Sequence, residues 1–441
     1  MIASTATSRP AFAMRLPALF SVLTLSTLAQ AGTPVEAPAH SGPAKPEVNW
    51  LTGEGANIGG FLFPHVHFQS VYGGTTADEV EHLGAGHHDP QRDGWTIQGF
   101  EFGTSLRAGE YVEGFGTYHL YYDRATDDWD GEFEEWFGKI KNLPGGLELR
   151  GGRYLSRFGL QNPIHMHGWD FVDSSLVNGR FLGDDGLYTI GGEVSWTLPV
   201  SWTSVLSVSV GVAPEHEHEH EGHEHAEEAL FEAEGSLFSD TFVTANWTNQ
   251  WNYNDFHQFR YGASGAWGDN EFGRTSQVYG IHLEYLWRQN GLEAGGSYFR
   301  WRTEAMYRRF GAVAEAHAHE HEHEHEEEAG HQGEEDHDHD HDHDHEAPAR
   351  RTLDEFGMYT ALAYGFDSGL EFGLRGDYVQ GIAAAGLDER FRLSPSVTWY
   401  LNKNRTLYFR TQYNYDHSND FGDEHSLWGQ VGFNWGGPEV R

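Results

Sequence analysis

Residues 280–288 read GIHLEYLWR, a stretch in which apolar and polar side chains alternate. Leu283 and Tyr285 fall on one face of an extended chain, whereas His282 and Glu284 fall on the other. A period of two residues is typical of a β-strand with one apolar and one polar side. The stretch therefore predicts a strand that separates an apolar environment from a polar one.

The same alternation recurs along most of the chain and predicts an all-β protein. After residue 31 no apolar run approaches the length of a membrane helix, and aromatic residues make up 14% of the chain. A soluble sandwich also alternates, but aromatic residues gathered near strand ends favour a transmembrane antiparallel outer-membrane β-barrel of about sixteen strands. The candidate strands are 58–72, 93–107, 110–123, 131–141, 145–156, 186–201, 203–213, 238–249, 257–268, 275–288, 291–304, 352–365, 369–380, 388–400, 405–417 and 424–435.

Both ends of the chain carry signals of export from a Gram-negative cytoplasm. Residues 1–31 combine two arginines, an apolar run and a small-residue cleavage site, which predicts a signal peptide. Residues 32–57 are Pro-rich and predict a flexible lead-in to a barrel over 58–435. The last strand has the form that the barrel-assembly machinery reads, although a C-terminal tail, 436–441, follows it. The chain has no cysteine, so no disulfide framework is expected.

Two low-complexity stretches hold sixteen of the 29 histidines, alternating with Glu or Asp. Such runs cannot bury an apolar face, so the connections 214–237 and 305–351 are predicted to be long, disordered and solvated. Imidazole and carboxylate suit Zn²⁺, with Ni²⁺ or Cu²⁺ as competitors; an acidic loop that binds metal only incidentally is the alternative. The candidate ligands are His216, His218, His220, His223, His225, His317, His319, His321, His323, His325, His331, His337, His339, His341, His343 and His345.

The lengths of the connections predict how the barrel is oriented. Bacterial barrels have short turns on the periplasmic side and longer loops outside. With a periplasmic N-terminus, short turns such as those near Gly109, Asn290 and Asn404 fall on the periplasmic side. Both histidine-rich connections then fall outside and are expected to be extracellular.

Several residues are predicted to face the lumen, which in a barrel of this size is an aqueous channel. The net charge of -39 predicts a mouth and lumen that concentrate cations. His65 and His67 share the polar face of the first strand, where they could hold a transition ion or be ordinary wet histidines. The connection 157–185 has apolar anchors and is expected to fold inward as a constriction. The candidate pore or constriction residues are His65, His67, His165, His167, Asp170, Asp173, Asp184 and Asp185.

One segment resembles a known family. The residues GRY at 152–154, HMHGWDFVD at 165–173 and FLGDDG at 181–186 are similar to the signature of zinc-regulated TonB-dependent outer-membrane receptors, whose members also carry His-rich loops. The resemblance implies zinc-responsive expression and metal uptake across the outer membrane. A TonB-dependent receptor needs a plug ahead of a barrel of about 22 strands. Only a short lead-in precedes the first strand here, so a plug-less, porin-like barrel is expected.

Together these features predict a channel that captures Zn²⁺, or a similar divalent ion, on external loops and admits it to the periplasm. Two alternatives stay open: a general solute-diffusion porin with incidental metal buffering, and a surface protein that sequesters metal. Expected partners are divalent metal ions, outer-membrane lipid and the barrel-assembly machinery, and a homo-trimer is compatible with the class. No enzymatic activity is expected, because no G-x-S-x-G elbow occurs. So acidic a chain does not suit nucleic acid.

The two histidine-rich loops should lose most of their Zn²⁺ capacity between pH 7.5 and about pH 5. Only neutral imidazole binds the ion, and its ordinary pKa is about 6.5. Calorimetric titration of the two loops as peptides measures this capacity at each pH. Equal capacity at both values would assign the binding to carboxylates instead.

Overall fold

A computed structural model describes residues 49, 51–123, 128–214, 231–232, 237–293, 295–314, 350–402, 405–436 and 439. The predicted signal peptide and all sixteen histidines of the two histidine-rich stretches lie outside the described residues. No helix among the described residues is long and apolar enough to cross a membrane.

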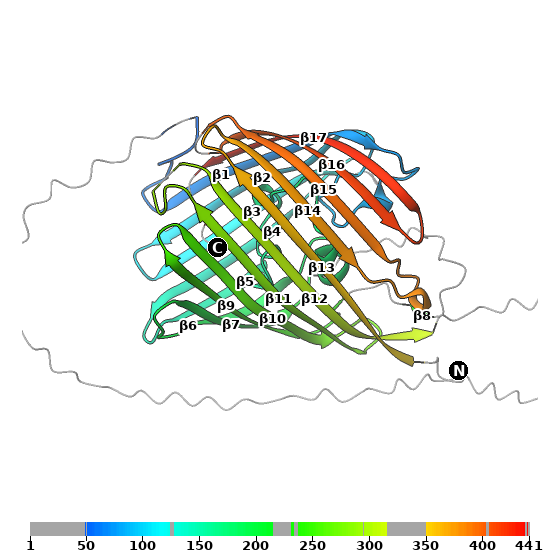
Figure 1. Ribbon diagram of the computed structural model, residues 1–441. Helices are drawn as coiled ribbons and strands as arrows, with labels where there is room; N and C mark the ends of the chain where they lie inside the picture. The colour runs from blue at the N-terminus through cyan, green and yellow to red at the C-terminus, as the bar shows by residue number, and fades with distance from the viewer. Residues whose placement is uncertain are drawn as a thin grey trace, which may run out of the picture. The chain divides into compact units, whose positions relative to one another are not determined.

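The described chain forms one closed antiparallel sheet (Figure 1). Each long strand pairs with its neighbours in sequence, and β1 pairs with both β2 and β17, which closes the barrel. The two-residue β8 pairs with the end of β12 and is not part of the wall. The strands are β1 (Leu62–Thr75), β2 (Gly94–Ala108), β3 (Val112–Asp123), β4 (Asp128–Leu143), β5 (Leu147–Leu155), β6 (Tyr188–Thr197), β7 (Thr203–Val212), β8 (Phe231–Glu232), β9 (Phe242–Asn254), β10 (His257–Asp269), β11 (Thr275–Arg288), β12 (Tyr298–Ala314), β13 (Arg350–Gly365), β14 (Leu370–Val379), β15 (Arg390–Tyr400), β16 (Leu407–Ser418) and β17 (Gly422–Gly436).

The predicted sixteen-stranded all-β barrel is confirmed, and most strand bounds agree within a few residues. The strand predicted at 291–304 is wrong in its bounds, because β12 occupies 298–314. Gly295 and Gly296 have φ values of 84° and 80°, a backbone region that favours glycine, so the turn between β11 and β12 extends over them. The connection predicted from residue 305 consequently begins after Ala314, because residues 305–314 continue the strand.

The wall of the barrel is apolar outside and polar inside. On β15 the burial of successive residues alternates strictly, with Leu393 and Trp399 exposed at 38% and 51%. The inward residues of the same strand include Arg392 and Ser394, which are almost fully buried. An apolar outer surface of this extent is stable against lipid rather than water. The alternation in the sequence therefore corresponds to the two faces of a membrane-embedded wall, the apolar face toward lipid and the polar face toward the lumen.

The two ends of the barrel differ in the length of their connections. The end that carries 109–111, 144–146 and 366–369 has short turns and is called the turn end. The other end, called the long-loop end, carries the connections 76–93 and 156–187. The strands that flank both histidine-rich stretches, β7 with β9 and β12 with β13, also open toward the long-loop end. This arrangement matches the order of short and long connections predicted from the sequence.

Residues 156–187, called the constriction loop, fold into the barrel and carry η2 (Met166–Gly168) and α1 (Leu176–Leu182). Phe158, Val177 and Phe181 are fully buried there, and they pack against inward side chains of the wall such as Met306 and Tyr359. Ser175 caps the short helix by accepting a hydrogen bond from the backbone N–H of Asn178. The loop therefore lies inside the barrel as an element packed against the wall.

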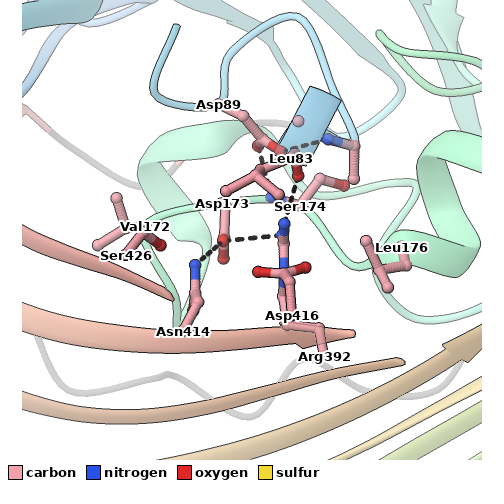
Figure 2. Close-up of polar contacts among 12 residues, drawn as sticks. Leu83, Asp89, Val172, Asp173, Ser174, Leu176, Arg392, Asn414, Asp416 and Ser426 are labelled. Carbon is pink, nitrogen blue, oxygen red and sulfur yellow. Dashed lines mark hydrogen bonds and ion pairs between the residues drawn. The ribbon is translucent and has the colours of Figure 1, made fainter. Parts of the chain in front are cut away.

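Asp173 fixes the constriction loop to the barrel wall (Figure 2). Its carboxylate accepts hydrogen bonds from Arg375 at 2.8 Å and Arg392 at 3.0 Å. Gln412 and Asn414 each donate a further hydrogen bond at 2.8 Å. Burial raises the pKa of Asp173, but the two guanidinium groups and the two amides outweigh it and hold the pKa below its usual value. The carboxylate is thus a fully paired buried anion.

Other arginines hold the same loop from β12 and β16. Asp170 pairs with Arg300 and Arg302, and Arg410 donates to the carbonyl oxygens of Trp169 and Phe171 at 2.8 and 2.9 Å. The prediction of an acidic lumen is therefore wrong for this side of the barrel, because inward arginines dominate it. This surface, called the arginine wall, consists of Arg300, Arg302, Arg375, Arg390, Arg392 and Arg410.

Replacing Asp173 by Asn should release the constriction loop without opening the strand ladder. Removing one partner of a buried ion pair costs about 3–5 kcal/mol, because it leaves the other charge uncompensated. We expect D173N to raise single-channel conductance in planar bilayers while the barrel keeps its heat-resistant mobility on gels.

D420N makes the same change of charge on an exposed turn at the same end of the barrel and should leave the conductance unaltered. Equal conductance of D173N and the unaltered chain would show that the loop is held by its apolar packing instead.

Candidate metal centre

The part of the lumen lined by β2, β3 and β4 carries buried carboxylates and imidazoles. Glu101 on β2 and His119 on β3 point inward and are 1% and 0% exposed. Glu134 and Glu135 on β4 are adjacent in sequence, yet both are buried, at 3% and 2%. This group, Glu101, His119, Glu134 and Glu135, is called the acidic wall.

A β-bulge places both glutamates of β4 inside the barrel. In the pairing with β3, Thr117 faces Glu135 while Tyr118 faces Phe133, so Glu134 is the extra residue. The flanking Phe133 and Trp136 remain on the outer face, at 60% and 50% exposure. A regular strand would have turned one of the two carboxylates toward lipid. The bulge thus concentrates two buried carboxylates at one level of the lumen.

The constriction loop brings His165 to these carboxylates. The Nδ1 atom of His165 lies 3.0 Å from Glu134 Oε2 and 3.7 Å from Glu101 Oε2. Its other nitrogen, Nε2, lies 2.8 Å from Glu135 Oε2. A histidine that binds a metal usually donates its remaining N–H to a carboxylate, which orients the ring. Glu135 is in the position for this role, with Nδ1 turned to the two other glutamates.

A second group of possible ligands adjoins the first through the same glutamate. His88 Nε2 and His119 Nδ1 lie 3.5 and 3.6 Å from Glu134 Oε1. Among the described residues neither ring nitrogen of His119 has a hydrogen-bond partner, although the ring is fully buried. Buried polar atoms without a partner are rare and call for an explanation such as an ion.

The spacing of these atoms fits tetrahedral coordination. Zn²⁺ bonds of about 2.0–2.1 Å at tetrahedral angles separate neighbouring ligand atoms by about 3.3 Å. The separations in both groups, between 3.0 and 3.7 Å, are close to this value. The candidate ligands form two trios, His88–His119–Glu134 and Glu101–Glu134–His165. Within each trio the ligand atoms all lie within 4.8 Å of one another. The residues present therefore fit a Zn²⁺-like ion, with a carboxylate shared between neighbouring positions.

Glycines on β2 provide the room for two histidines. A Cβ atom on Gly99 would lie 2.1 Å from Nε2 of His119, and one on Gly103 would lie 2.0 Å from Cε1 of His65. Both separations are far below van der Waals contact, so any larger residue would displace the imidazole. The motif GFEFG at 99–103 thus places two small residues on either side of the inward Glu101.

Two histidines of the connections have raised pKa values. Burial opposes protonation of His88, but Glu134, Asp185 and Glu101 outweigh burial and raise the pKa of His88 to about 9. Burial likewise opposes protonation of His167, and Glu101 with Glu439 raises its pKa to about 9. Without a metal ion these imidazoles carry protons at neutral pH. An arriving cation must displace those protons.

The other residues predicted from the sequence are divided between two sides of the lumen. His65 and His67 of β1 are buried inside the barrel, and the ring of His67 stacks on that of His167 with centroids 3.6 Å apart. Oδ1 of Asp185 lies 4.0 Å from Nε2 of His88, whereas Asp184 is exposed. Asp170 and Asp173 pair with arginines and belong to none of the trios found among the described residues, which is a structural role the sequence analysis did not distinguish. The sequence analysis missed Glu101, His88, His119, Glu134, Glu135 and Glu439.

The cavities next to the constriction loop are small. One of about 20 Å³ is lined by residues that include His88, Glu134 and His165. Another of about 30 Å³ lies between the loop and the arginine wall, next to Asp170 and Arg375. A cavity of roughly 10–15 Å³ is large enough to hold one water molecule. These spaces accommodate a water or a bare ion, but not an ion with a complete hydration shell.

Comparisons with known proteins give similarity at the level of fold. No family model matches the sequence. An uncharacterized protein of Aquifex aeolicus is 36% identical over 77 residues, which are 18% of this chain and 16% of that protein, so the match spans less than a fifth of either.

Among solved structures, the Comamonas acidovorans anion-selective porin is 8% identical, with 85% of this chain and 98% of the porin covered and a TM-score of 0.48. Salmonella typhi OmpF is 12% identical, with coverage of 85% and 97% and a TM-score of 0.48. The Acinetobacter baumannii outer-membrane channel DcaP is 11% identical, with coverage of 85% and 96% and a TM-score of 0.46.

The Zn²⁺ affinity of the interior should continue to rise from pH 7 to about pH 9. Raised pKa values mean that His88 and His167 lose their protons only near pH 9, so metal binding competes with protons throughout this range. Calorimetry in two buffers with different ionisation enthalpies, on a full-length variant whose sixteen loop histidines are serine, measures both affinity and proton release. Constant affinity between pH 7 and 9 would exclude both histidines as ligands.

Proposed function

We propose that this protein is an outer-membrane channel that passes a divalent transition-metal ion, Zn²⁺ by ligand type, through its lumen. The observation that carries the proposal is the sharing of Glu134 by the two interior trios at the constriction loop. Imidazole nitrogen and carboxylate oxygen are the ligands that Zn²⁺ takes in proteins, and Ni²⁺ and Cu²⁺ accept the same set. The shared carboxylate lets an ion move between neighbouring positions by exchanging one ligand at a time.

The packed lumen supports selective rather than general diffusion. Two cavities beside the constriction loop, of about 30 and 20 Å³, fit a water or a bare ion, so a cation that passes through them must give up most of its hydration shell. Protein ligands that replace the lost waters make this step favourable for ions they bind well, as in other selective channels. A solute without metal-like coordination gains no such compensation. The site chemistry thus favours a metal channel over a general porin.

The exterior supplies the other parts of the proposal. The exposed apolar residues of the outer face suit embedding in outer-membrane lipid. The histidine-rich stretches connect strands at the long-loop end, where they would raise the local concentration of metal ahead of the lumen. Their many weak ligands act as a reservoir, and the interior trios act as the selective step. An extracellular position of the loops and a trimeric assembly belong to this proposal.

Zn²⁺ uptake into proteoliposomes that contain a Zn²⁺-sensitive dye tests the function. H165Q removes the imidazole between Glu101 and Glu134 and should reduce the uptake rate by at least about tenfold, since single changes around a metal site typically cost 10–100-fold. Serine in place of the sixteen loop histidines should slow uptake only when Zn²⁺ is limiting, because capture becomes irrelevant once the bulk supply saturates the channel.

H282Q is the matched control. His282 is also a buried, inward histidine, 5% exposed on β11, and belongs to none of the trios found among the described residues. Its variant should take up Zn²⁺ within about twofold of the unaltered protein. Uptake of K⁺ or sugars at the same rate as Zn²⁺, or equal losses in H165Q and H282Q, would replace the metal channel with a solute-diffusion porin.

A further inference from the structure

The carboxylate of Glu439, close to the C-terminus, lies inside the turn end of the lumen. β17 ends at Gly436, and three residues later Glu439 Oε1 lies 2.9 Å from His67 Nε2 and 3.4 Å from His65 Nδ1. His167 Nε2 of the constriction loop lies 3.4 Å from the same oxygen. Three imidazoles from two parts of the fold therefore turn a nitrogen toward one carboxylate.

The orientation of His67 is suited to coordination. Its Nδ1 lies 2.9 Å from Oδ1 of Asn434, an acceptor, so Nδ1–H donates there and the other ring nitrogen, Nε2, faces Glu439. A lone pair that faces a carboxylate oxygen is repulsive unless a proton or a metal ion lies between them. The ligand atoms of His65, His67 and Glu439 all fall within 4.8 Å of one another. Their separations are close to the roughly 3.3 Å expected of tetrahedral ligands.

The backbone around this group is built for close approach. Gly436 has a φ of 125°, and a Cβ atom there would lie 2.6 Å from the carbonyl oxygen of Pro64 and 2.7 Å from Cα of His65. Only glycine fits at this end of β17, where the strand lies against Pro64 and His65 of β1. On the other side of the ring, Gly103 leaves the space that His65 occupies. The close pairing of β17 with β1 and the buried position of the His65 ring thus depend on two glycines.

We propose that His65, His67 and Glu439 form a third metal site, completed by the C-terminal tail, which binds the ion on the turn side of the constriction and releases it from the barrel. The inference rests on the proposed channel function for its role in release, but not for the binding itself. Three protein ligands leave one position open for water or for an incoming ligand, which suits a transfer site.

His167 connects this site to the interior trios. Its Nδ1 lies 2.9 Å from Glu101 Oε2, a member of one trio, and its Nε2 faces Glu439. Alternate binding to these two carboxylates gives a continuous series of ligands from His88 at the long-loop end to Glu439 at the turn end. The tail carboxylate is therefore the last ligand in the series.

Co²⁺ binding to the purified full-length protein in detergent tests the site without requiring transport. The loop histidines are replaced by serine so that the visible d–d bands of tetrahedral Co²⁺ report only the interior, and Zn²⁺ is added as a competitor. E439Q should weaken one class of bound Co²⁺ by at least about tenfold. E101Q should instead weaken binding at the constriction and leave the class lost in E439Q in place.

E110Q is the matched control, because Glu110 is exposed in a turn at the same end of the barrel, and it should bind Co²⁺ like the parent. E439H, which returns a ligand, should recover the lost class. Unchanged Co²⁺ binding in E439Q would overturn the site, and loss of every class together would show that the tail only maintains the fold.

A separate measurement distinguishes failure of the site from failure of the channel function. If proteoliposomes of the parent take up no Zn²⁺ while E439Q still loses its Co²⁺ class, the channel function fails and the metal site stands. If the parent transports Zn²⁺ and E439Q does so at the same saturated rate, release through the tail site is excluded.

Discussion

The ion pairs of Asp173 are the interaction on which the interior of this protein depends. A barrel of sixteen strands is too wide for its own side chains to fill, so whatever occupies the lumen must be held there. Asp173 receives hydrogen bonds from Arg375, Arg392, Gln412 and Asn414, which offset the cost of burying its charge. With one side of the constriction loop fixed in this way, the histidines of its other side face the acidic wall. The arrangement of the candidate metal ligands thus depends on a cluster of ion pairs and hydrogen bonds that contains none of those ligands.

The two walls of the lumen differ in the charged groups that contact the constriction loop. Arginines from β12, β14, β15 and β16 line one side and are used to bind the loop, whereas glutamates from β2 and β4 line the other. The arginines pair with carboxylates and with backbone carbonyls, whereas His165 and His88 approach the glutamates of the acidic wall. In the proposed channel, a cation that enters the lumen would be directed to the acidic wall. This difference is why the overall charge of -39 is a poor guide to the local chemistry.

Particular residues show how far sequence reasoning reached. Alternation along β11 and β15 was sufficient to predict strands with one lipid-facing side, because a period of two is a local property. His65 and His67 were assigned to the lumen by the same period, and His165 and His167 by their place in an aromatic connection. Glu134 escaped notice because its inward direction depends on a bulge against β3, which alternation within β4 cannot reveal. The predicted bounds of strand β12 were wrong because the glycines at 295 and 296 lengthen the turn before it.

The sequence by itself determined the class of the fold, the order of short and long connections and the abundance of Zn²⁺-type ligands, since these follow from local pattern and composition. The tertiary structure decided which ligands meet. Glu439 approaches His65 and His67 only because closure of β17 on β1 brings positions more than 370 residues apart into contact. His165 meets Glu134 only because arginines on the far strands fix the loop between them. These contacts are formed by barrel closure and by long-range ion pairs, and no short segment of the sequence contains both partners.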